Sequence, residues 1–154
     1  MPPALTLLVL LLLAPPAVVH RGRATTFGPS KSDPNNPNDT LACDLHLRGV
    51  RRSVDPRELA VALPSWHAPC GALVLVCLPR TGRCAAARVL DRGPRAAILG
   101  RRKKRGDVVR GVRVDPHAID ATRAVQRAVG FDGDEDVVWV VMPDVNLDQN
   151  TSTR

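Results

Sequence analysis

Short apolar stretches separated by turn residues fill the middle of this 154-residue chain. Six of them follow one another: 41–47, 58–63, 72–78, 85–90, 108–114 and 137–142. The first two alternate weakly between apolar and polar positions, and the other four are apolar runs rich in Val, Leu and Ala. Both patterns are typical of β-strands, so the chain is expected to be mainly β and to form a small barrel.

One segment, 121–129, has the periodicity of a helix instead. Its apolar residues recur at positions i, i+3, i+4, i+7 and i+8: Ala121, Ala124, Val125, Ala128 and Val129. Asp120 or Thr122 can cap its start, and Gly130 can end it. The pattern therefore predicts one helix between the apolar run at 108–114 and the last strand.

The N-terminus carries a nearly pure leucine run at 5–13, which is shorter than the ~20 residues that span a bilayer. Small residues and prolines follow it. A secretory signal within 1–24 is expected, cleaved after Ala17 or Ala24, so that the mature chain has no stable membrane insertion. An uncleaved anchor at the membrane surface is the alternative.

Composition divides the rest of the chain. Residues 25–40 are rich in Pro, Asn, Asp, Ser and Thr with almost nothing apolar, which predicts a disordered linker. Residues 41–143 are expected to form one folded domain, and 144–154 a flexible polar tail. We expect a monomer.

The chain has an even number of cysteines: Cys43, Cys70, Cys77 and Cys84. After the expected secretory signal, four cysteines predict two disulfides among three possible pairings. Cys77 and Cys84 flank a Thr-Gly turn, which would place them opposite each other across a hairpin and leave Cys43 to pair with Cys70. Zinc is the competing interpretation, because His46 and His67 lie near the cysteines. The short Cys spacing of structural zinc sites is missing, so neither a metal nor another cofactor is expected.

The charge is basic, with 22 Lys and Arg against 15 Asp and Glu. A positive chain attracts polyanions in general. The run at 101–105, Arg-Arg-Lys-Lys-Arg between two glycines, predicts an exposed loop that is either simply solvated or docks on anionic wall polymers. Nucleic acid is disfavoured by the leader and by the lack of aromatic residues interleaved with the basic ones.

Several short motifs occur in a fixed order along 41–143. They are Ala68-Pro69-Cys70-Gly71-Ala72, Thr81-Gly82, Asp91-Arg92-Gly93-Pro94, Ile119-Asp120-Ala121-Thr122 and Gly130. This combination resembles rare lipoprotein A (RlpA) and its relatives, the barwin-like endoglucanases and expansins. The resemblance implies a six-stranded double-psi β-barrel with one or two short helices, here stabilised by disulfides, that works on cell-wall polysaccharide.

The chain departs from that family at three places. The family histidine would align nearer Ser65 than His67, the basic run at 101–105 is an insertion, and Ala121 replaces a usual leucine. RlpA also carries a lipid on a cysteine directly after its leader. The first cysteine here is Cys43, so the lipoprotein version is not supported.

The resemblance assigns chemistry to Asp120, which matches the general acid of the glycan-cleaving relatives. A lytic transglycosylase needs no second carboxylate, because the 6-hydroxyl of the sugar closes on the anomeric carbon. A hydrolase would need one, and Asp91 is the candidate, although a role in holding the turn is favoured. As a mere helix cap, Asp120 would have a lowered pKa unless burial or a carboxylate such as Asp115 raised it.

Three further residues are candidates for the site. Trp66 offers an aromatic face to a sugar and His67 a hydrogen bond, with packing at the barrel mouth as the alternative. Arg92 is a candidate for substrate binding and can also pair with Asp91. Trp139 lies in an apolar run and is expected in the core.

Two functions remain open. One is a secreted enzyme that cleaves peptidoglycan in the manner of a lytic transglycosylase, with Asp120 as general acid. The other is an expansin-like module that binds peptidoglycan or another anionic wall glycan without cutting it. Both have the same fold and compartment, and they differ in the role of Asp120.

Overall fold

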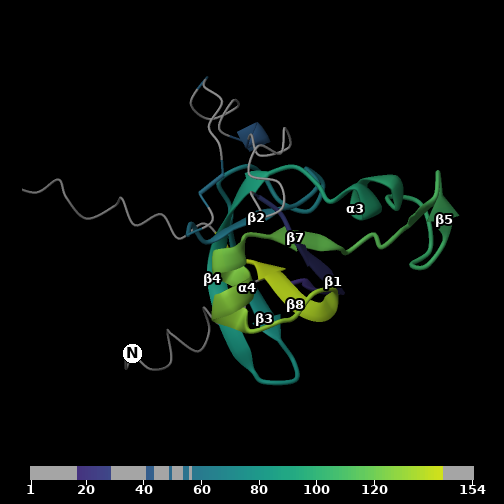
Figure 1. The fold of residues 1–154 in the computed structure, drawn as a ribbon. Helices are drawn as coiled ribbons and strands as arrows, with labels where there is room; N and C mark the ends of the chain where they lie inside the picture. Colours follow the sequence, from purple (N-terminus) through teal and green to yellow (C-terminus); the bar gives the residue numbers. More distant parts are fainter. Residues whose placement is uncertain (1–16, 29–40, 44–48, 50–53, 56, 144–154) are drawn as a thin grey trace, which may run out of the picture.

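The computed structural model describes residues 17–28, 41–43, 49, 54–55 and 57–143. Its centre is a closed barrel with the strand order β1-β7-β2-β4-β3-β8 (Figure 1). The six strands are β1 Val19–Thr26, β2 Ala60–Ala62, β3 Leu73–Leu78, β4 Arg83–Asp91, β7 Ile119–Ala121 and β8 Glu135–Val141. Outside the barrel lie two helices, α3 Arg95–Leu99 and α4 Arg123–Val129, and a hairpin of β5 Val108–Val109 with β6 Val112–Arg113.

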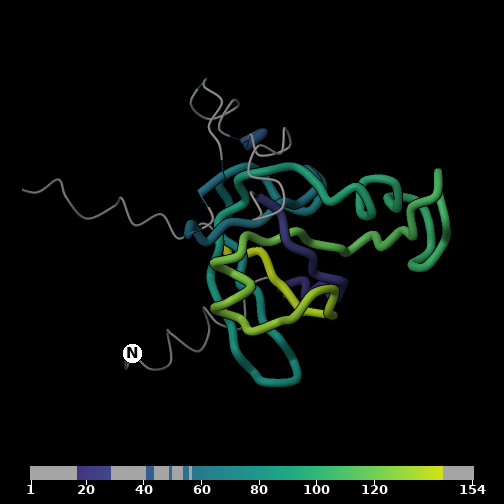
Figure 2. The backbone as a smooth tube through the Cα atoms, viewed as in Figure 1, coloured from purple at the N-terminus to yellow at the C-terminus, as the bar shows by residue number. Residues whose placement is uncertain are grey.

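The barrel mixes parallel and antiparallel pairing. The pairs β1/β7 and β2/β4 are parallel, and the other neighbouring strands are antiparallel. The fold is mainly β, a closed six-stranded barrel with the two short helices α3 and α4 among the described residues, and it is consistent with the double-psi β-barrel that the resemblance implies. α4 packs on the barrel against β4, whereas α3 and the β5–β6 hairpin project from one side (Figure 2).

Small apolar side chains fill the interior. Val74, Val76 and Leu78 point inward from β3 and alternate with more exposed residues, as the pleat requires. Trp139 of β8 is the largest side chain in this core and is almost fully buried, as expected. The narrow barrel is thus filled mainly by Val and Ala around one large ring.

Both expected disulfides are present. Cys43 is bonded to Cys70, and Cys77 to Cys84, which face each other across the β3–β4 pairing. All four thiols are therefore used, and the zinc alternative based on cysteine is wrong. Disulfides are typical of an oxidising, extracytoplasmic environment.

The N-terminal boundary of the domain differs from the expected one. β1 lies within the segments assigned to the leader and the linker, so the barrel begins at Val19 instead of residue 41. The strand lacks an apolar signal because its buried positions are Gly22 and Ala24, while arginines occupy the other face. Cleavage after Ala17 would leave β1 whole, and cleavage after Ala24 would remove most of it.

Two expected strands are also different. In 41–47 the described residues Ala42 and Cys43 are helical, and 44–47 lie outside the described residues. The stretch 108–114 is a hairpin, because Arg110 and Gly111 both adopt positive φ, 50° and 74°, and turn the chain between β5 and β6. The other four expected strands are found with boundaries shifted by a few residues.

The expected helix is confirmed as α4, which starts two residues later than predicted. Ala121 belongs to β7, and Gly130 ends the helix in the left-handed conformation. Within the described part of the chain, none of the helices has the length and apolar character that crossing a membrane requires. The leucine run at 5–13 and the tail at 144–154 lie outside the described residues.

Candidate functional site

Three adjacent strands bring the two aspartate motifs together at one end of the barrel. Ala62 of β2 is paired with Asp120 of β7 on one side and with Asp91 of β4 on the other. Neighbouring strands lie about 4.8 Å apart, which places the backbones of the two aspartates about 10 Å apart. Gly93 also adjoins Asp120, because a Cβ on Gly93 would lie 3.7 Å from Asp120 Oδ2.

Asp120 occupies a half-buried position at the edge of the barrel. The Thr25 hydroxyl on β1 donates a hydrogen bond to Asp120 Oδ1. Burial raises the pKa of Asp120 above its ordinary value of 3.8, and the charges of Asp91 and Asp134 add to this, while the Thr25 bond and Arg23 act in the opposite direction. A raised pKa is the shift that a general acid requires.

The helix-cap interpretation of Asp120 does not fit the structure. The N-cap position of α4 belongs to Thr122, and Asp120 lies in β7 ahead of it. Asp115 is not the carboxylate that raises the pKa of Asp120. It is buried, and its Oδ2 lies 3.0 Å from Arg105 Nε, so it holds the basic loop instead.

Asp91 holds the chain around the first disulfide. Its Oδ1 accepts a hydrogen bond of 2.9 Å from the backbone N–H of Ala42, next to Cys43. Burial raises the pKa of Asp91, and the backbone bonds from Ala42 and Arg92 and the Arg92 charge offset part of the rise. These contacts agree with the structural role favoured from the sequence.

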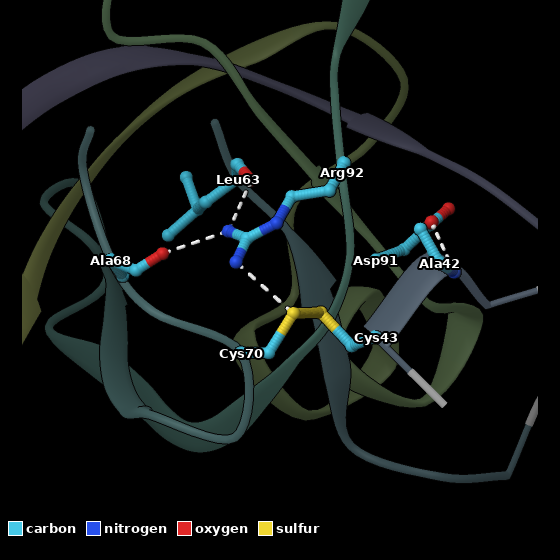
Figure 3. Close-up of a disulfide and its surroundings, with 7 residues drawn as sticks. All are labelled: Ala42, Cys43, Leu63, Ala68, Cys70, Asp91 and Arg92. Atoms are coloured by element: carbon cyan, nitrogen blue, oxygen red, sulfur yellow. Dashed lines mark hydrogen bonds between the residues drawn. A yellow bond between two sulfur atoms is a disulfide. The ribbon is translucent and has the colours of Figure 1, made fainter. Parts of the chain in front are cut away.

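Arg92 points into the protein on the other side of the strand (Figure 3). Its Nη1 donates to the carbonyl oxygens of Leu63 and Ala68 at 3.2 and 2.8 Å, and its Nη2 lies 3.0 Å from Cys70 Sγ. Burial is the main cause of its lowered pKa. The guanidinium thus fixes the loop between β2 and β3, and these contacts compete with the predicted role in substrate binding.

Trp66 and His67 lie in that same loop, between β2 and β3. Trp66 is 40% exposed, and the guanidinium carbon of Arg101 lies 4.9 Å from its ring centroid. The Nε2 of His67 donates to the carbonyl oxygen of Pro116 at 2.7 Å. The basic run therefore contacts Trp66, the residue proposed to stack on a sugar, through Arg101.

The rest of the basic run divides into anchored and exposed residues. Arg105 pairs with Asp136 of β8 as well as with Asp115. These pairs raise the pKa of Arg105 and lower that of Asp136. All five residues of 101–105 retain large exposed surfaces, as the sequence predicts.

A histidine cluster was not anticipated. The rings of His20, His67 and His117 lie together beside a cavity of about 380 Å³ whose lining includes Val18, Trp66 and Val141. Burial, together with the neighbouring histidines, lowers the pKa of His20 to about 4, and burial also lowers the pKa of His67. Sequence reasoning missed the cluster because His20 lay in the expected leader and the other two are far apart along the chain.

The cluster and Asp120 are at different ends of β1. Thr25, which contacts Asp120, follows His20 by five residues on that strand. At about 3.4 Å per residue the separation along the strand is about 17 Å. The barrel therefore presents two distinct groups of chemically active side chains.

Comparison with known proteins yields similarity in structure only. No protein-family model matches the chain, and no curated protein matches its sequence. Sixteen chains of solved structures match it. One is the Streptomyces papain inhibitor (SPI), with a TM-score of 0.45 and 18% sequence identity over 82% of this chain and 96% of that one.

Proposed function

We propose that the chain is a secreted, RlpA-like protein that cleaves murein glycan strands in the manner of a lytic transglycosylase, with Asp120 as general acid. The main support for this proposal is the environment of Asp120. Burial and the negative charge of Asp91 favour its protonated form at the edge of the barrel. A protonated carboxyl that remains accessible can donate to a glycosidic oxygen.

The chemistry needs only this one carboxyl. Asp120 protonates the leaving oxygen while the 6-hydroxyl of the same sugar attacks the anomeric carbon, and the resulting carboxylate recovers the hydroxyl proton. The glycosidic C–O bond breaks, the new C–O bond gives an anhydro-muramyl end, and water is not consumed. Asp91 is held by Ala42 and is not required as a base.

Other features support the compartment and the polymer. The two disulfides suit an extracytoplasmic protein, and the net charge of +7 suits an anionic wall glycan. Arg101 lies over the ring of Trp66, and Arg102, Lys103 and Lys104, which follow it in the chain, are exposed. Together they offer a basic surface with one aromatic ring.

A specific contact favours the alternative of a non-catalytic wall-binding module. The Thr25 hydroxyl donates to Asp120 and so stabilises the ionised carboxylate, which cannot act as an acid. In that case the barrel binds glycan through its basic surface. Binding would then weaken as salt is added, since exposed charges are screened.

The test is cleavage of purified sacculi, followed by mass spectrometry of the released glycans. Wild type is expected to release anhydro-muramyl ends, and Asp120→Asn is expected to release none while remaining folded. Asp134→Asn is the matched control, because Asp134 is an exposed carboxylate close enough to influence the Asp120 pKa. Salt-sensitive binding without cleavage by wild type would favour the binding module.

A further inference from the structure

Three of the chain's four histidines meet at one place on the barrel surface. His20 comes from β1, His67 from the loop after β2, and His117 from the segment before β7. One ring nitrogen from each lies within 4.8 Å of the other two. Imidazole nitrogen is the commonest metal ligand in proteins, and it suits transition metals such as Zn, Cu, Fe and Ni.

We propose that His20, His67 and His117 form a binding site for a transition-metal ion, with Zn²⁺ as the expected occupant. The site is separate from the Asp120 group and does not depend on the proposed function. Imidazole nitrogen is a suitable ligand for Zn²⁺, and no carboxylate or thiolate is needed to complete a three-histidine set.

The distance between two of the ligands already fits a bound ion. His20 Nδ1 lies 3.2 Å from His117 Nδ1. Two nitrogens that each bind Zn²⁺ at about 2.0–2.1 Å in tetrahedral geometry lie about 3.3–3.4 Å apart. An ion can therefore bridge this pair with almost no movement, and a ring nitrogen of His67 lies within 4.8 Å of the ligand nitrogens of the other two histidines.

Contacts of the rings with their surroundings support the same assignment. The Nε2–H of His67 donates to the Pro116 carbonyl, which leaves the lone pair on its Nδ1. A ligating histidine usually has such a backbone partner on its other nitrogen. Trp139 orients the remaining two, because it stacks on the His20 ring at 4.0 Å and its Nε1 donates to the His117 carbonyl.

The cavity beside the cluster gives the ion an open side. It has a volume of about 380 Å³, and His20 and His67 form part of its lining with Trp66. Sites with three protein ligands and one open position hold water or a small anion on the metal. We therefore expect the fourth position to exchange with small anionic ligands.

Calorimetric titration of the disulfide-bonded chain, with β1 retained, by ZnCl₂ tests the site. One Zn²⁺ per chain is expected, and replacement of any one of His20, His67 and His117 by Ala should weaken binding by at least about tenfold, the lower bound for losing even an indirect partner. His46→Ala is the matched control, because His46 is the fourth histidine and is not part of the cluster. The affinity of this variant for Zn²⁺ should equal that of wild type. Equal binding by all four variants, loss in His46→Ala, or no binding by wild type would overturn the proposal.

A measurement on wild type keeps the proposal testable if a variant fails to fold. Co²⁺ in place of Zn²⁺ should give the intense visible absorption of a four-coordinate site, and added azide should shift it by replacing the fourth ligand. Proton–nitrogen correlation spectra of the imidazoles should show three perturbed rings on Zn²⁺ addition. Perturbation of fewer than three rings, or a weak six-coordinate Co²⁺ spectrum that azide leaves unchanged, contradicts the three-histidine site.

Discussion

The environment of each aspartate determines what it can do. Asp120 and Asp91 share a half-buried end of the barrel, and burial raises the pKa of both. Asp136, on the surface of β8, has its pKa lowered by the hydrogen bond from Arg105. The same side chain is thus disposed to hold its proton in one place and to lose it in another.

This difference predicts opposite pH dependences of stability. A raised folded-state pKa means that Asp120 contributes stability below its ordinary pKa of 3.8, which is lost as pH rises through the higher folded value. Asn cannot ionise. The melting temperature of Asp120→Asn should therefore rise relative to wild type as pH increases from 3.5 to 7, as measured by calorimetry.

The control is Asp136→Asn. Because the pKa of Asp136 is lowered, its contribution is present above 3.8 and is lost as pH falls through the folded value. This variant should be less stable than wild type at pH 7, and the difference should shrink toward pH 3. The same trend in both variants would show that the two environments are not distinct.

Arg92 is predicted to stabilise the fold through its planar fork. A lysine ammonium in its place cannot reach the two carbonyls and the sulfur together, so Arg92→Lys should lower the free energy of unfolding by about 1–3 kcal/mol. Urea denaturation measures this. Arg88→Lys is the comparison, because the exposed side chain of Arg88 donates only to the Gly71 carbonyl among the residues that the structure describes. Equal losses in the two variants would contradict the anchoring role.

At the scale of elements, only the strands that contain a clear run of apolar residues could be predicted from the sequence. β3 is a continuous apolar run, as is β8 from Val137 onward, and the sequence locates both strands. β1 could not be found, because its inward residues are Gly22 and Ala24 and because Arg21 and Arg23 on its outer face form ion pairs with acidic residues of the 134–136 segment. Its strand identity is set by tertiary pairing with β7 and β8.

Gly22 gives the sharpest test of that pairing. A Cβ at this position would lie 2.0 Å from the His117 carbonyl oxygen, so β1 can approach the chain there only without a side chain. Gly22→Ala should destabilise the fold by about 3 kcal/mol or more, since backbone must move. Gly133→Ala, where φ is 55° and the space is open, should cost only about 1 kcal/mol. Chemical denaturation of both variants measures these losses of unfolding free energy. A loss of about 1 kcal/mol or less in Gly22→Ala would mean that β1 does not pack closely against the segment around His117.

The two disulfides should differ in how much they stabilise the fold. Cys43–Cys70 joins residues 27 apart and Cys77–Cys84 residues 7 apart. Because the longer loop restricts the unfolded chain more, Cys43–Cys70 is expected to stabilise the fold by about 3–4 kcal/mol and Cys77–Cys84 by about 2–3 kcal/mol. Replacing the first pair by Ala should therefore lower the melting temperature more than replacing the second. The opposite order would mean that strain or packing outweighs loop closure.

At the scale of the whole molecule, both candidate sites are assembled from distant parts of the chain. The sequence singled out Asp91 and Asp120 as candidate partners, and the structure places the two on either side of Ala62. Thr25 could not be predicted there, because its segment was assigned to the linker. The histidine cluster escaped for a similar reason, since closing the barrel is what brings His20 to His67 and His117.

The most direct test of the central claim is cleavage of glycan strands in water enriched in oxygen-18, followed by mass spectrometry of the new ends. If Asp120 acts as general acid in a transglycosylase, wild type should give anhydro-muramyl ends without heavy oxygen, and Asp120→Asn should give no new ends. Heavy oxygen at the reducing ends would mean hydrolysis with a water nucleophile. Unlabelled anhydro ends from Asp120→Asn at the wild-type rate would contradict the assignment of Asp120.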